Sequence, residues 1–247
     1  MATMTPDLTT PLARAADDAW AAFSRAATEA GLSAPNDPET VKAKTLRRVF
    51  ALSDFVAHAA ARHPRMVIDL IDSGDFFRDY NDGEYPDRVT AALAGVTDET
   101  ALAAALRELR RREMVRIAVR DLGGLSDLFG TVAHLSAFAD AAIDGALSVL
   151  YGWESARSGV PRSADGAAQE MVVLAMGKLG AGELNFSSDV DLIFAFPERG
   201  ETDGNRPVTC DEFFLRLGRK LIKALGASTA DGFVFRVDMD LRPFGGN

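Results

Sequence analysis

Residues 177–194 read Gly-Lys-Leu-Gly-Ala-Gly-Glu-Leu-Asn-Phe-Ser-Ser-Asp-Val-Asp-Leu-Ile-Phe, a glycine-rich loop that runs directly into two carboxylates, Asp189 and Asp191. Apolar runs at 171–176 (MVVLAM) and 190–196 (VDLIFAF) lie on either side of the loop, and both predict buried strands. Because side chains alternate along a strand, the two aspartates are expected on one face and their apolar neighbours on the other. A glycine-rich loop beside paired carboxylates is typical of a metal-dependent nucleotide-transfer site.

A third carboxylate lies in the segment 233–241, FVFRVDMDL, which alternates as a half-buried strand does. Asp238 is therefore expected to complete a cluster with Asp189 and Asp191. Three acids this close repel one another unless a cation lies between them, and oxygen ligands with few histidines favour Mg²⁺. Such a trio can hold two metal ions about 3.5 to 4 Å apart that act on an in-line displacement at phosphorus. The simpler alternative is an acidic strand end in a turn.

The loop itself supplies groups that suit phosphate. Gly177 and Gly182 allow positive φ and a close approach of the backbone, and Lys178 offers a charge to phosphate oxygens. The glycine spacing matches neither the dinucleotide-binding fingerprint nor the P-loop. Ser188 suggests a nucleophile, but no histidine follows His134. A hydroxyl that contacts phosphate, or a turn hydrogen bond, is the favoured interpretation.

The chain upstream of this site predicts helices. Alanine-rich segments with apolar residues at helical spacing cover 11–31, 39–63, 97–121 and 125–156. Residues 157–169 (RSGVPRSADGAAQ) read as a connection, and an amphipathic helix at 211–225 separates the second and third strands. We therefore expect an α+β fold, in which a helical domain at 1–160 is followed by a sheet-containing domain at 168–247.

Six arginines form a basic cluster in the helix predicted at 97–121: Arg107, Arg110, Arg111, Arg112, Arg116 and Arg120. The favoured interpretation is a solvated helix face, because Glu108 and Glu113 are interleaved with them. The alternative is a contact with a partner or with phosphate.

Composition excludes several classes of protein. The net charge of −9 argues against broad nucleic-acid binding. The single cysteine excludes an internal disulfide, and no cluster of cysteines and histidines offers a zinc site. The first residues lack a signal-peptide pattern, and we find no apolar run near the roughly 18 to 20 residues that span a bilayer. We expect a cytoplasmic protein with no membrane insertion.

Three separated blocks carry a resemblance to a known family: GKLGAGELNFSSDVDLIFAFPE, FFLRLGRKLIKAL and DGFVFRVDMDLRPFG. They resemble the bifunctional glutamine synthetase adenylyltransferase/adenylyl-removing enzymes, members of the polymerase-β-like nucleotidyltransferase superfamily. Residues 111–147 are similar to the helical region that precedes the catalytic unit there, so the likeness covers about 45–247. That family carries two such units. The amino-acid sequence at 185–189 and 242–245 favours the N-terminal, adenylyl-removing unit. The resemblance also implies that the chain holds only part of that unit.

The resemblance implies a role for each matching residue. Asp189 and Asp191 would bind the catalytic Mg²⁺ ions, with Asp238 as the third ligand and base. The nucleotide and phosphate groups would be held by Gly177, Lys178, Ser188 and Arg242. Asp240 stands where the family often has arginine, which puts the phosphate affinity at that strand end in doubt.

The implied reaction is phosphorolysis of a modified protein. Inorganic phosphate would attack the adenylyl group on a tyrosine of glutamine synthetase and release ADP and the unmodified enzyme. Implied partners are glutamine synthetase, a nucleotide, phosphate and a PII-type nitrogen signalling protein. Two alternatives stay open: ATP-dependent adenylylation of the same tyrosine by the same acids, and a regulatory or binding fragment without turnover.

Overall fold

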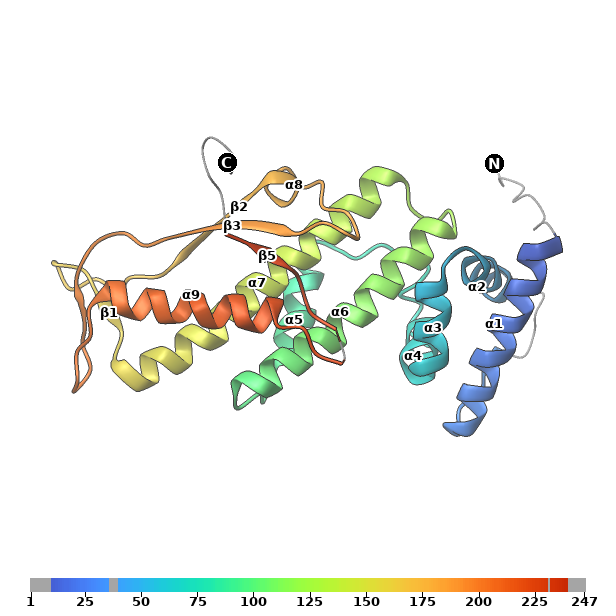
Figure 1. Cartoon of the computed structure of the whole chain (residues 1–247), viewed down its shortest axis with the longest axis horizontal. Coiled ribbons are helices and arrows are strands. Elements are labelled where there is room, and N and C mark those ends of the chain that lie inside the picture. The colour runs from blue at the N-terminus through green and yellow to red at the C-terminus, as the bar shows by residue number, and fades with distance from the viewer. Residues whose placement is uncertain (1–9, 36–39, 231, 240–247) are drawn as a thin grey trace. The chain divides into compact units, whose positions relative to one another are not determined.

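The computed structural model describes residues 10–35, 40–230 and 232–239 of the chain (Figure 1). It confirms the expected α+β fold, since helices fill most of the chain up to residue 158 and short strands appear only after it. In chain order the elements are α1 Thr10–Glu29, α2 Val41–Leu52, α3 Asp54–Arg62, α4 Pro64–Asp72, α5 Glu84–Leu93, α6 Glu99–Leu122, α7 Leu128–Ser158, β1 Pro161–Arg162, β2 Val172–Met176, α8 Gly177–Gly180, β3 Val190–Ala195, β4 Glu201–Thr202, α9 Cys210–Gly226 and β5 Val237–Asp238.

The chain packs as two compact units whose division runs through α6 and α7. Unit 1 combines the described residues up to Asn81 with Arg111–Thr131, and unit 2 combines Asp82–Arg110 with the described residues from Val132 onward. These packing units cut across the expected domains 1–160 and 168–247. The reason is that α7 packs against α9 and the segment before β5, and α5 packs on α7. The division into 1–160 and 168–247 stays a prediction.

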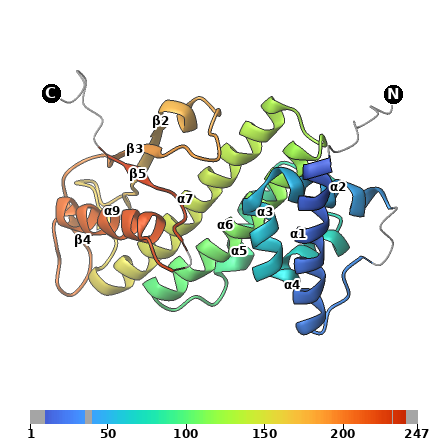
Figure 2. The same cartoon turned by 45° about the vertical axis from the view of Figure 1, so that its right-hand side comes forward.

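Unit 1 is built on α1 to α4, which pack against one another (Figure 2). Its core includes the mutually packed aromatic rings of Trp20, Phe23 and Phe50. The helix predicted at 39–63 is interrupted at Ser53, whose backbone is extended and whose hydroxyl accepts a hydrogen bond from the Val56 amide of the next helix. A serine in the middle of a helical pattern can thus cap a new helix, because its side chain replaces the missing backbone partner.

The interpretation of the arginine cluster as a solvated face is wrong for its C-terminal members. Arg116 is fully buried and Arg120 is 3% exposed. Arg116 donates to the backbone carbonyls of Asp75 and Arg78 at 2.9 and 2.8 Å, and its guanidinium lies 3.4 Å from the centre of the Tyr80 ring. These arginines therefore hold the segment after α4 against α6 by satisfying its buried carbonyls.

Unit 2 contains a three-stranded sheet in the order β2-β3-β5. β2 runs antiparallel to β3, with Met176 opposite Asp191, and β5 runs parallel to β3, with Asp238 opposite Asp191. Figures 1 and 2 both show the β2–β3 hairpin alongside α7 and α9. A second, two-stranded sheet pairs β1 with β4, so the expected connection at 157–169 contains an ordered strand.

The predicted third strand is shorter than expected. Among the described residues of this segment, only Val237 and Asp238 pair with β3, whereas Val234 and Phe235 are both buried and both donate their amides to the Leu225 carbonyl. Two consecutive buried side chains break the alternation predicted for 233–241. The apolar stripe predicted for the preceding helix is confirmed, because the side chains on that face of α9 are buried: Phe213, Phe214, Leu217, Leu221 and Leu225.

α7 is long and apolar enough to cross a membrane by length and composition alone, contrary to the sequence expectation that no segment qualifies. Of its most apolar stretch, 44% is buried inside the protein. Leu135, Phe138, Ala142 and Leu150 are buried at helical spacing. Core helices commonly pass the same test, and burial in unit 2 accounts for these apolar side chains.

Candidate functional site

The candidate site lies on the face of the three-stranded sheet that α9 does not cover. Val190 and Leu192 of β3 are 0% and 1% exposed, while Asp191 between them points to the other face, as predicted. On the helix side, a Cβ added to Gly218 of α9 would come within 2.9 Å of the Phe194 ring. The acidic residues therefore face away from the helices that support the sheet.

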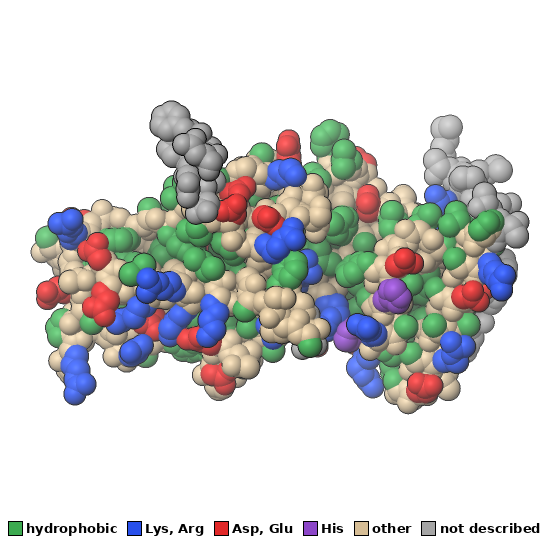
Figure 3. Space-filling model, in the orientation of Figure 1, with side chains coloured by type: hydrophobic (Ala, Val, Ile, Leu, Met, Phe, Trp, Pro, Cys, Tyr) green, Lys and Arg blue, Asp and Glu red, His purple; other side chains and the backbone are tan. Residues whose placement is uncertain are grey.

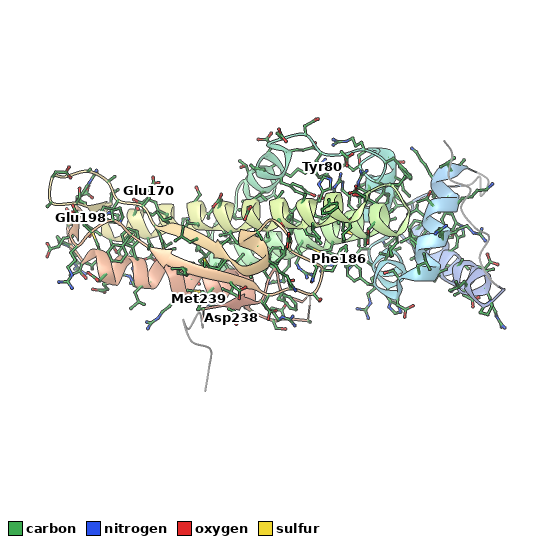
Figure 4. All side chains as sticks on the ribbon, turned by 90° about the horizontal axis from the view of Figure 1, so that it is seen from above. Tyr80, Glu170, Phe186, Glu198, Asp238 and Met239 are labelled. Carbon is green, nitrogen blue, oxygen red and sulfur yellow. The ribbon has the colours of Figure 1, made fainter. Side chains whose placement is uncertain are left out.

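Asp191 and Asp238 occupy paired positions on neighbouring parallel strands. Paired residues of adjacent strands share a face and stand on backbones about 4.8 Å apart. Asp191 is half-buried and Asp238 is exposed at the strand edge, where Figure 4 labels it beside Met239. The register thus brings together two of the three carboxylates that the sequence predicts as one cluster.

Asp189 has a different partner, Arg236, which sequence reasoning did not assign to the site. The Arg236 Nε donates to Asp189 Oδ1, and its Nη2 donates to the Ser187 carbonyl at 3.0 Å. The pair is about half exposed. The alternation of the predicted strand 233–241 already put Arg236 on the same side as Asp238, so this signal was available. Arg236 restrains both the first acid and the turn that leads to it.

The oxygen atoms at this site suit a metal ion, but the three predicted carboxylates do not lie together as one set of ligands. Among the residues that the structure describes, no three His, Cys, Asp or Glu side chains lie close enough to hold one ion. The oxygen donors of Asp191 and Asp238 suit a hard divalent cation, whereas Asp189 is turned toward Arg236. The three-carboxylate Mg²⁺ site stays a prediction.

The glycine-rich loop begins with one helical turn, α8, that connects β2 to the loop. Gly177 has φ +55°, and a Cβ at this position would lie 2.3 Å from Asp191 Oδ2. Glycine suits the left-handed backbone conformation, and a Cβ here would require the Asp191 carboxylate to shift. Lys178 is exposed on α8. Its contact with phosphate stays a prediction.

The turn before Asp189 is organised by Asn185. Its Oδ1 accepts hydrogen bonds from the Ser187 amide at 3.1 Å, the Ser187 hydroxyl at 3.2 Å and the Ser188 hydroxyl at 2.8 Å. The Ser188 hydroxyl thus makes the turn hydrogen bond that was one of its two expected roles, and its role toward phosphate stays a prediction. Asparagine is a frequent turn residue, which was the signal that sequence reasoning overlooked.

Two further predicted positions, Arg242 and Asp240, lie outside the described residues. Their contribution to phosphate binding stays a prediction.

Comparisons with known proteins agree with one another. The family described as glutamate-ammonia ligase adenylyltransferase matches residues 43–247. A protein of Thioalkalivibrio sulfidiphilus, named bifunctional glutamine synthetase adenylyltransferase/adenylyl-removing enzyme, is 48% identical over 223 residues, which are 90% of this chain and 22% of that protein. Proteins of the same name from Pseudomonas syringae pv. tomato and Pseudomonas aeruginosa are 50% identical over 80% and 81% of this chain. The chain spans about a fifth of the length of these curated relatives.

Proposed function

Because the chain belongs to the glutamate-ammonia ligase adenylyltransferase family, we propose that it is a cytoplasmic nucleotidyltransferase unit that regulates glutamine synthetase. We propose further that it removes AMP from an adenylylated tyrosine of that enzyme by phosphorolysis. The name of its relatives covers both addition and removal of the adenylyl group. The turn Asn185-Phe-Ser-Ser-Asp189 favours removal, by its resemblance to the adenylyl-removing unit.

The observation that carries the proposal is the pairing of Asp191 with Asp238 on an uncovered sheet face, next to a glycine that makes room for Asp191. Paired carboxylates on an accessible face offer hard oxygen donors, which is the ligand type that a divalent cation prefers.

We propose that Asp191 and Asp238 bind Mg²⁺, and that Asp189 joins them when Arg236 releases it. When bound, Mg²⁺ neutralises charge on phosphoryl oxygens and so favours departure of the tyrosine phenolate. The ion pair between Arg236 and Asp189 is weak, because both side chains are about half exposed.

The remaining steps belong to the protein's own side chains and backbone. Lys178 provides an exposed positive charge for the phosphate oxygens, with Gly177, Ser188 and Arg242 as further contacts. An oxygen of inorganic phosphate attacks the adenylyl phosphorus, and the bond from that phosphorus to the tyrosine oxygen breaks. Asp238 accepts the proton of the attacking phosphate, and the phenolate takes up a proton from water. The products are ADP and the unmodified tyrosine.

The test is to incubate the chain with adenylylated glutamine synthetase, phosphate and Mg²⁺ and to identify the released nucleotide. ADP supports removal, whereas ATP formed only with pyrophosphate supports the adenylylating direction. Asp191→Asn should abolish turnover, and Asp69→Asn, an exposed aspartate on α4, is the matched control. No nucleotide under either condition, with both proteins folded, would leave only the binding-fragment alternative.

Glutamine synthetase is the proposed protein substrate, and a PII-type nitrogen signalling protein is the proposed regulator. Co-sedimentation of the chain with each protein, in adenylylated and unmodified form for the synthetase, tests these partners separately from turnover.

A further inference from the structure

A small cavity of about 170 Å³ lies between the first half of α6 and the end of α9, within unit 2. Its cationic walls are Arg107 from α6 and Lys220 and Lys223 from α9. Hydroxyl-bearing residues Thr100 and Thr229 and the carboxylate of Glu99 complete its polar lining. Figure 3 shows Lys and Arg side chains gathered over α9.

This cavity is separate from the acidic site. α9 packs on the sheet face that carries Phe194, as the contact with Gly218 shows. Asp191 and Asp238 lie on the opposite face. A ligand in the cavity would therefore not touch the residues proposed for phosphorolysis.

The cations of the cavity exceed its acids. Arg107 makes no hydrogen bond or ion pair with any residue that the structure describes, and its Nε is shielded from solvent without an acceptor. Lys220 Nζ lies 2.9 Å from Glu99 Oε1 and 2.7 Å from Glu154 Oε1, and Lys223 Nζ lies 3.3 Å from Glu99 Oε2. Each ammonium has three donors, so both lysines keep at least one donor beyond these contacts. Three cations thus stand against two carboxylates, Glu99 and Glu154, and Glu154 also pairs with Arg216.

We propose that this cavity binds a small multivalent oxyanion of the phosphate type. Arg107 supplies paired donors to two oxygens, which is the geometry that guanidinium groups offer to phosphate. Lys223 adds a charge from the opposite wall.

The size of the cavity restricts the ligand. Cavities for drug-sized ligands begin at about 300 Å³. The observed 170 Å³ equals roughly five or six water volumes of about 30 Å³ each. Inorganic phosphate or a single phosphoryl group fits this space.

The experiment is calorimetric titration of the chain with inorganic phosphate and with sulfate, in EDTA and at constant ionic strength set with chloride. Without divalent cations the carboxylates of the acidic face disfavour phosphate, and loss of binding in Arg107→Gln assigns the metal-independent binding to the cavity. Arg107→Gln should weaken binding roughly tenfold or more, because it removes charge-assisted hydrogen bonds. Lys223→Gln should weaken binding severalfold, since this side chain is 71% exposed. Arg219→Gln, an exposed cation of α9 outside the lining, should leave affinity within about twofold.

Asp191→Asn separates this proposal from the proposed function. It should abolish AMP removal and leave metal-independent phosphate binding unchanged. Tighter metal-independent binding in Asp191→Asn would place the anion on the acidic face, because the substitution removes a charge that repels phosphate there, and it would overturn the cavity site. Equal affinity in wild type and Arg107→Gln, or no binding of either oxyanion at millimolar concentration, would overturn it as well.

Discussion

Replacement of Gly177 by alanine tests whether this glycine makes the acidic site possible. Gly177 and Gly182 both adopt positive φ, at +55° and +71°. Only at Gly177 would a new Cβ meet another group, at 2.3 Å from Asp191 Oδ2, whereas nothing lies within 4 Å at Gly182. Gly182→Ala is therefore a matched control that carries the backbone cost without the contact.

The two costs can be separated in magnitude. A residue with a Cβ in the left-handed region costs about 1 to 2 kcal/mol, which lowers the Tm of a chain of this size by about 2 to 8 °C. Both variants should show this drop. In Gly177→Ala the carboxylate must also retreat from 2.3 Å to the 3.4 Å at which ordinary contact begins, a shift of about 1.1 Å. A misplacement of about 1 Å in a reacting group can cost roughly a hundredfold in rate.

The assays are thermal unfolding, calorimetric Mg²⁺ binding and the AMP-removal reaction. We expect Gly177→Ala to lose about a hundredfold in turnover and to bind Mg²⁺ more weakly, while Gly182→Ala keeps both within about threefold. The Mg²⁺ titration provides a result even if turnover is lost for another reason. Equal Mg²⁺ affinity and equal turnover in the two variants would refute the claim that Gly177 makes room for Asp191.

Three further outcomes follow from single contacts. Arg116→Ala leaves two buried carbonyls without donors and should destabilise the protein by about 3 to 5 kcal/mol, measured as a lower Tm, whereas a change under about 1 kcal/mol would contradict its bracing role. Burial raises the pKa of the Tyr80 hydroxyl. The protonated side chain therefore contributes stability that is complete below the ordinary tyrosine pKa near 10 and declines at higher pH. Tyr80→Phe should remove the last phase, at the highest pH, of an ultraviolet titration of the tyrosines. Arg236→Gln removes a cation from Asp189 and should raise Mg²⁺ affinity severalfold by calorimetry, and a lower affinity would show that Arg236 helps to build the site.

The buried face of an element could be predicted where its apolar residues follow a single strong period. The alternation of Val190, Asp191 and Leu192 correctly separated a buried face from an exposed one, and the apolar stripe of α9 is buried as expected. Both patterns reflect burial of one face, which local periodicity encodes directly. The same reasoning failed at Val234 and Phe235, where both amides bond to one carbonyl of α9. That contact depends on a residue outside the segment, so no local pattern contains it.

The prediction of a solvated face for the arginine cluster failed for a related reason. Interleaved arginines and glutamates on a helix usually indicate a solvated face. Here Arg116 is buried because the segment after α4 brings carbonyl groups that need donors, and Arg112 binds the buried Asp75 at 2.5 Å. Guanidinium groups meet several acceptors at once, so an arginine with enough partners can be buried where lysine could not. The helix sequence does not reveal which segment will cover it.

At the acidic site, too, the sequence predicts only part of what the structure shows. The sequence predicts three carboxylates on neighbouring strands, but it does not determine which cation each carboxylate takes. In the proposed metal site, Arg236 would compete with a divalent ion for Asp189, and an ion pair that is about half exposed contributes only about 0 to 1 kcal/mol. A divalent ion shared with Asp191 and Asp238 gains more, because it also relieves repulsion between those acids. The Arg236 contact is therefore consistent with the proposed three-carboxylate metal site, in which Asp189 would leave Arg236 when the ion binds.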